Sequence, residues 1–166
     1  MGGCHKQVND EKRIVLMYGA DILSDAKVQS QKRYLQHGTV SVFEHSLFAA
    51  CLCLRIAAVL HIRVDQRAMV RGALLHDYFL YDWHDPDPTH RLHGFRHAMR
   101  ALKNARRDFS LGRIECDMIR THMFPLNLVL PRYRESAILC VADKICALAE
   151  TLFSEQFRRA MAASIH

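Results

Sequence analysis

The segment RGALLHDYFLYDWHD, residues 71–85, places an imidazole and a carboxylate, His76 and Asp77, directly after an apolar run at 73–75. The residues before the pair have the composition of a buried helix, and we expect a helix over residues 66–78. Ionisable groups beside a core need partners, because burial without one is costly. The pair therefore predicts that polar groups reach it from elsewhere in the chain.

Two other apolar segments also carry an ionisable residue. The stretch 42–60 is rich in helix formers, lacks glycine and proline, and contains His45. The stretch 134–155 is similar and contains Asp143. Both segments are apolar on most sides, which is typical of buried helices.

The remaining elements are also predicted to be helical. We expect short helices within 11–36 after a frayed start, longer ones over 94–107 and 113–123, and a loop at 82–90, where two Asp-Pro steps occur. Strand patterns are scarce, and no linker or repeat divides the chain. The sequence predicts an all-α fold in one domain, residues 1–166, with a core of about 36–155 and a helical extension over 1–35.

Composition limits the partners and the compartment. Half of the 166 residues are apolar, as in ordinary globular domains. The net charge of +6 permits an anionic partner without naming one, and no nucleic-acid recognition motif occurs. Six cysteines without a CxxC spacing, and no early secretory signal, favour a cytoplasmic protein. Because Arg55 and His61 interrupt the longest apolar stretch, we expect no membrane span. The oligomeric state is left open.

Four ionisable residues on three apolar helices predict a metal site: His45, His76, Asp77 and Asp143. A single buried histidine is more often a hydrogen-bonded core residue, and Asp143 alone has a possible partner in Lys144 or an arginine. Two imidazoles and two carboxylates together are better explained by a divalent cation between them. This ligand mixture suits Fe, Mn, Co, Ni and Zn, among which spacing does not choose.

The order of these residues resembles the H…HD…D signature of the HD-domain metal-dependent phosphohydrolases. The flanking patterns EHSLFAA, GALLHD and VADKICA match the usual surroundings in that family, and the similarity extends from about Gln36 to Thr151. The resemblance implies a compact helical HD-type domain. It also implies that the four residues hold the first metal ion, with His76 and Asp77 at the catalytic centre.

Some branches of the family hold two metal ions, and the resemblance extends to candidates for the second. His97 and His122 correspond to the family's third and fourth histidines, with Asp77 bridging the two ions. His93 competes with His97, because both open the same predicted helix one turn apart. The expected cofactor is therefore one or two divalent transition-metal ions.

Metal chemistry then suggests phosphoester hydrolysis. A bound divalent ion lowers the pKa of its water, and hydroxide attacks phosphorus while cations neutralise the phosphoryl oxygens. A GxSxG or phosphatase-type cysteine motif is absent from the sequence. We expect a small phosphorylated substrate, such as a nucleotide or phosphomonoester. Candidate phosphate-binding residues are Lys144, Arg71 and Arg100, with Arg91 and Arg96 nearby, and the loop carrying Tyr81, Trp83, His84 and His90 is a candidate roof.

Three other functions stay open at this point. A few HD-type proteins are di-iron oxygenases, which use six ligands to activate oxygen. A domain of this kind can also bind metal and nucleotide as a sensor without turnover. Nucleic-acid binding is weaker, because the positive charge is spread along the chain.

Overall fold

The computed structural model describes the backbone of residues 2–81 and 93–165, and the side chains of 10–36, 38–81 and 96–152. Its elements in chain order are α1 (Gly2–Ser24), α2 (Ala26–Ser30), the 3₁₀ helix η1 (Gln31–Arg33), β1 (Leu35–His37), β2 (Val40–Ser41), α3 (Val42–Val59), α4 (Gln66–Leu75), α5 (His93–Asp108), α6 (Arg113–Thr121) and α7 (Arg134–Ile165). The predicted all-α class is confirmed.

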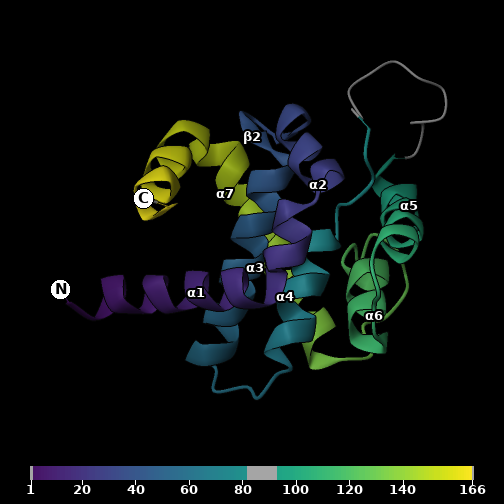
Figure 1. Ribbon diagram of the computed structural model, residues 1–166, viewed down its shortest axis with the longest axis horizontal. Coiled ribbons are helices and arrows are strands. Elements are labelled where there is room, and N and C mark those ends of the chain that lie inside the picture. Colours follow the sequence, from purple (N-terminus) through teal and green to yellow (C-terminus); the bar gives the residue numbers. More distant parts are fainter. Residues whose placement is uncertain (1, 82–92, 166) are drawn as a thin grey trace.

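Helices α3 and α4 lie at the centre and pack against each other (Figure 1). Helix α7 packs against α3, and α1 packs against α4 and α3. Helices α5 and α6 lie together at the right in Figure 1, with α6 against both α4 and α7. Each helix of this central layer directs apolar side chains such as Ala49, Ala73 and Leu139 into one core. The residues predicted to hold a metal ion, such as His45, His76 and Asp143, lie in or at the end of helices that meet in this core.

The N-terminal region shares this core. Val15, Ile22 and Val28 are buried and belong to the same hydrophobic cluster as the central helices. The frayed start expected before residue 11 is wrong, because α1 already begins at Gly2. The segment before residue 36 therefore builds part of the interior.

Two helix boundaries differ from the predicted ones. Helix α4 ends at Leu75, with His76 as its C-cap, so His76 and Asp77 lie just beyond the helix instead of inside it. The chain turns there because the backbone N–H of Tyr78 donates to the carbonyl of Leu75 at 3.2 Å. Helix α7 continues past residue 155, since no glycine or proline interrupts 134–165.

A short antiparallel hairpin precedes α3 and was not predicted. Strands β1 and β2 pair around Gly38, whose φ of 57° is the left-handed conformation that glycine adopts without strain. Ser41 at its end caps α3 in a capping box with Glu44. The hairpin fixes the start of α3 and, with it, the position of His45.

Helix α3 is long and apolar enough to cross a membrane by length and composition alone. Half of it is buried inside the domain, and its buried residues include His45, Phe48 and Cys53. A central helix of a folded domain has this same character, so the observation is weak evidence for a span.

The crossing of α4 and α6 depends on Gly72. A Cβ atom at this position would lie 2.6 Å from Sδ and 3.1 Å from Cβ of Met118. We expect Gly72→Ala to destabilise the fold by about 1–3 kcal/mol, because overpacking a core forces side chains and backbone to move. Thermal unfolding measures this as a lower Tm. In the Met118→Ala background the cost should shrink, and an unchanged cost would contradict this packing explanation.

Helix α5 forms hydrogen bonds with the segment that follows Asp77. The Asn104 amide donates to the carbonyls of Tyr78 and Phe79 at 3.1 and 3.2 Å. The fully buried Tyr78 donates its hydroxyl to Asp108 at 3.1 Å. These contacts hold the chain on the C-terminal side of Asp77 against α5.

Asp108 makes stability depend on pH at the acid end. Its carboxylate accepts hydrogen bonds from three side chains, those of Arg107, Lys27 and Tyr78. These donors hold the pKa of Asp108 well below its usual range. The stabilisation is thus present above the ordinary carboxyl pKa of about 4 and is lost as the pH falls towards the lowered value. We expect Asp108→Asn to lower the Tm at pH 7, with a smaller difference below about pH 4. A difference independent of pH would contradict this, and Asp10→Asn, at an exposed position, is the control.

Candidate metal centre

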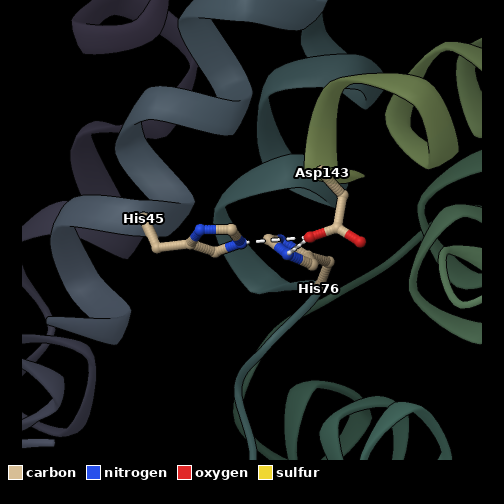
Figure 2. A group of neighbouring side chains, drawn as sticks. All are labelled: His45, His76 and Asp143. Carbon is tan, nitrogen blue, oxygen red and sulfur yellow. Dashed lines mark hydrogen bonds and ion pairs between the residues drawn. The ribbon is translucent and has the colours of Figure 1, made fainter. Parts of the chain in front are cut away.

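Six side chains from five segments converge in the interior: His45 (α3), His76 and Asp77 (end of α4), His97 (α5), His122 (end of α6) and Asp143 (α7). All six residues are buried, with at most 8% of any of them exposed. Figure 2 shows three of them approaching one another from separate helices. We call these six residues the His/Asp cluster.

The first half of the cluster has Asp143 at its centre. Asp143 Oδ1 lies 3.1 Å from Nε2 of His45 and 3.6 Å from Nε2 of His76 (Figure 2). Asp77 Oδ2 lies 3.4 Å from Nε2 of His76 and 3.9 Å from Nε2 of His45. Two imidazole nitrogens and two carboxylate oxygens thus face one small volume.

The second half uses the other oxygen of Asp77. Asp77 Oδ1 lies 3.3 Å from Nε2 of His97 and 3.4 Å from Nε2 of His122. The two histidine nitrogens are 2.9 Å apart. Asp77 therefore directs one oxygen to each half of the cluster. This arrangement is compatible with one ion or with two ions that share its carboxylate.

Hydrogen bonds fix the orientation of three imidazoles. His45 donates its Nδ1–H to the Glu150 carboxylate at 2.9 Å. His76 donates its Nδ1–H to the Ala73 carbonyl at 2.7 Å. His122 donates its Nδ1–H to the Ile119 carbonyl at 2.8 Å. With Nδ1 bonded in this way, Nε2 is the ring nitrogen directed to the cluster, which is how metal-binding histidines are usually held.

The interior atoms have the chemistry that a cation requires. Within the part of the chain that the structure describes, His76 Nε2 and Asp77 Oδ1 are buried and make no hydrogen bond. Leaving such groups unsatisfied is costly, whereas coordination to a divalent ion would satisfy both. Two overlapping groups, His45–His76–Asp143 and His76–Asp77–His122, have ligand atoms close enough together to hold an ion. The residues present fit a metal.

The electrostatics keep the ligands in their binding forms. Burial alone would raise the pKa values of Asp77 and Asp143, yet the surrounding histidines hold both well below the usual range. Burial lowers the pKa of His122, which favours the neutral imidazole. His45 differs, because Asp143 and Glu150 outweigh its burial and raise its pKa to about 10. Without a cation, a proton on His45 compensates those two carboxylates.

The prediction from sequence missed three supporting residues. Glu150 is fully buried and accepts the hydrogen bond from His45 Nδ1. The side-chain amide of Gln36 donates to Asp77 Oδ2, and that of Gln31 donates to the Asp77 carbonyl at 2.9 Å. A partial signal existed for Glu150, which lies seven residues after Asp143 and so on the same helix face.

Two of the expected phosphate-binding cations lie beside the cluster. Lys144 Nζ donates to the His122 carbonyl at 2.9 Å and lies 3.6 Å from Asp143 Oδ2, with 44% of its side chain exposed. Arg100 is exposed one turn after His97, and its guanidinium carbon lies 4.7 Å from the centre of the Tyr81 ring. Both place positive charge near the ligands.

Arg71 has a different partner from the one expected. Its guanidinium is buried and donates to both carboxylate oxygens of Asp21 in α1, at 2.6 and 2.9 Å. It thus ties α4 to α1, and this ion pair accounts for its charge without a substrate. The expected roof residues Trp83, His84 and His90, the nearby Arg91, and the side chain of the competing His93 lie outside the described residues.

Glu150 is predicted to strengthen metal binding at the cluster through its hydrogen bond with His45. We expect Glu150→Gln to weaken metal retention by about 10–100-fold, the usual effect of losing an outer-shell partner of a ligating histidine. Titration with a competing chelator measures this. Glu11→Gln is the matched control, because it makes the same change at a buried carboxylate that bonds Arg55 instead of a cluster residue. Equal affinities in the Glu150 variant and the wild type would show that this contact does not orient His45 for binding.

A comparison with models of protein families gives one match to the chain. The model described as HD domain matches residues 42–148, which contain all six residues of the His/Asp cluster. No curated protein and no solved structure matches the chain. The family is largely one of metal-dependent hydrolases, which agrees with a buried group of histidines and aspartates able to hold a metal. Residues 42–148 make up more than half of the chain, and the protein belongs to the HD domain family.

Proposed function

We propose that the protein is a metal-dependent phosphohydrolase that acts on a small phosphorylated molecule, such as a nucleotide or phosphomonoester. The cofactor in this proposal is one or two ions of Fe, Mn, Co, Ni or Zn, and the compartment is the cytoplasm. The observation that carries the proposal is the buried His/Asp cluster, in which His76 Nε2 and Asp77 Oδ1 make no hydrogen bond with any described residue. The five cysteines whose side chains the structure describes are free, which agrees with a reducing compartment.

Each half of the cluster has a distinct role in this proposal. His45, His76, Asp77 and Asp143 would hold the first ion, and His97 and His122 would hold the second with Asp77. A divalent ion, when bound, supplies Lewis acidity and lowers the pKa of water. The chain contributes fixed imidazole nitrogens and carboxylate oxygens, and a carboxylate or histidine beside the metal would accept the proton.

The substrate would approach beside Asp143. Its side chain is 12% exposed, while the side chains of the other five cluster residues are at most 5% exposed. Lys144 Nζ lies at this edge. An ammonium group there is suited to bind a phosphoryl oxygen, and it becomes more effective as negative charge develops on that oxygen. Arg100 would add a second positive charge.

A di-iron oxygenase is the second candidate. The observation that favours it is the second half of the cluster, because His97 and His122 complete a set of six ligand-type side chains around Asp77. Imidazole and carboxylate ligands suit iron as well as the other divalent ions. Metal content and reaction type separate the two proposals.

The test begins with elemental analysis of freshly purified protein. The metals found are then supplied in a phosphate-release screen over phosphomonoesters and nucleotides. The proposal expects bound transition metal and metal-dependent phosphate release from at least one substrate. Tight nucleotide binding without phosphate release across all metals would favour a sensor instead. Oxygen consumption by protein with two bound irons, without hydrolysis, would favour the oxygenase.

A further inference from the structure

A groove of about 540 Å³ lies outside the His/Asp cluster, between α5, α6 and the segment that leads into α7. Leu102 and Leu111 are among its apolar lining residues, and none of the six cluster residues lines it. Four arginines line it as well: Arg106, Arg113, Arg120 and Arg132. We call this the arginine groove.

The four arginines come from three separate parts of the fold. Arg113 and Arg120 are seven residues apart in α6, which puts them on the same face of that helix. Arg106 belongs to α5, and Arg132 lies shortly before α7 begins. All four are exposed. Packing of α5 against α6 therefore gathers charges that are distant in the sequence around one concave surface.

Most of this charge is uncompensated. The guanidinium groups of Arg113, Arg120 and Arg132 form no ion pair or hydrogen bond with any residue that the structure describes. The Arg106 Nε–H group contacts only the Cys116 sulfur there, at 3.4 Å. Four converging guanidinium groups without carboxylate partners attract a multiply charged anion and suit bidentate binding of phosphate.

One carboxylate, that of Asp117, also lines the groove. Its Oδ2 atom accepts the Arg132 backbone N–H at 2.9 Å and the Ser136 hydroxyl at 2.7 Å. Asp117 thereby holds the segment before α7 against α6 and keeps Arg132 at the groove. A single carboxylate leaves three of the four positive charges unbalanced.

The groove also has an aromatic wall. Tyr133 is half-buried and lines it beside Arg132. A tyrosine ring offers a flat surface on which a nucleobase can stack. The volume lies within the range of about 300–1,000 Å³ typical of small-ligand sites. Phosphates, a flat ring and this size together describe a nucleotide.

We propose that the arginine groove binds a nucleoside di- or triphosphate, with the phosphates on the arginines and the base against Tyr133. The site is separate from the His/Asp cluster and does not depend on the proposed hydrolase activity. Binding is expected without any metal ion, because the guanidinium groups supply the positive charge themselves. It is also expected to weaken as salt is added.

The experiment measures binding of ATP to the full chain in EDTA by calorimetry. The test variant is Arg113→Gln/Arg120→Gln. The control is Arg13→Gln/Lys103→Gln, which removes the same charge at exposed positions outside the groove. We expect the test variant to lose at least about tenfold in affinity and the control to change less than about twofold. Because EDTA removes metal from the cluster, an affinity loss confined to the test variant locates binding in the groove.

Three outcomes would overturn the proposal. The first is that ATP does not bind in EDTA, and the second is that it binds the test variant as tightly as the wild type. The third is that inorganic triphosphate binds as tightly as ATP, which would make the groove a simple anion site. If the first outcome is found and a single-stranded oligonucleotide binds, the groove is a nucleic-acid surface.

Discussion

Asp77→Ala is expected to remove bound metal and to abolish phosphate release. Asp77 faces both halves of the His/Asp cluster, with Oδ2 near His76 and Oδ1 near His97 and His122. Its loss should therefore weaken both halves at once. The expected fall in metal affinity exceeds the about 10–100-fold that follows loss of an outer-shell partner.

Elemental analysis and a phosphate-release assay on the same preparation measure this effect. Asp10→Ala makes the same chemical change at an exposed position of α1 and should keep both metal and activity. Because Asp77 is buried, circular dichroism and thermal unfolding must show that the variant is folded. Asp77→Asn is the second test, since it keeps the shape of the side chain and removes its charge. If either folded variant retained wild-type metal content, the ligand assignment would be wrong.

The sequence was sufficient to identify the helices that matter. His45, His76 and Asp143 stand out because each is an ionisable residue in or at the end of a strongly apolar segment. An apolar helix accepts such a residue only where something in the interior compensates it. That physical cost is visible in one sequence, and it led to side chains whose ligand atoms the structure brings within 4.8 Å of one another.

Glu150 was missed because its own segment does not show that it is buried beside a partner. In the stretch ALAETLF it reads as an ordinary polar residue, and its spacing from Asp143 alone does not show that packing of α7 against α3 buries it against His45. The partners of Asp77 are also distant in the chain. Gln36 is 41 residues away, and its position depends on the β1–β2 hairpin, for which the sequence has little strand signal.

Arg71 shows a further limit of predicting site residues from the sequence alone. Its proximity to His76 in sequence suggested a role at the site, but a helix distributes neighbouring residues over all of its faces. Arg71 meets Asp21 of α1 because that helix packs across α4. The end of α4 is similarly decided by tertiary contacts, since the Asn104 amide and Gln31 fix the backbone after Leu75.

The second large effect is expected from His97→Ala and His122→Ala, made separately. If the protein is a phosphohydrolase whose first ion lies between His45, His76, Asp77 and Asp143, each variant should lose only the second half of the cluster. We expect each to retain about one metal ion per chain and to hydrolyse substrate more slowly than the wild type, by more than the about 10–100-fold that follows loss of an outer-shell partner. Some metal-dependent phosphate release should survive.

An oxygenase predicts a different result for the same variants. A reaction that needs two irons loses all activity when either His97 or His122 is removed, whatever metal is left in the first half. Lys103→Ala, at an exposed position of the same helix as His97, should behave like the wild type in either case. Retained single-metal hydrolysis therefore supports the phosphohydrolase. Complete loss in both variants, with two irons and oxygen consumption in the wild type, would instead assign the cluster to oxygen chemistry.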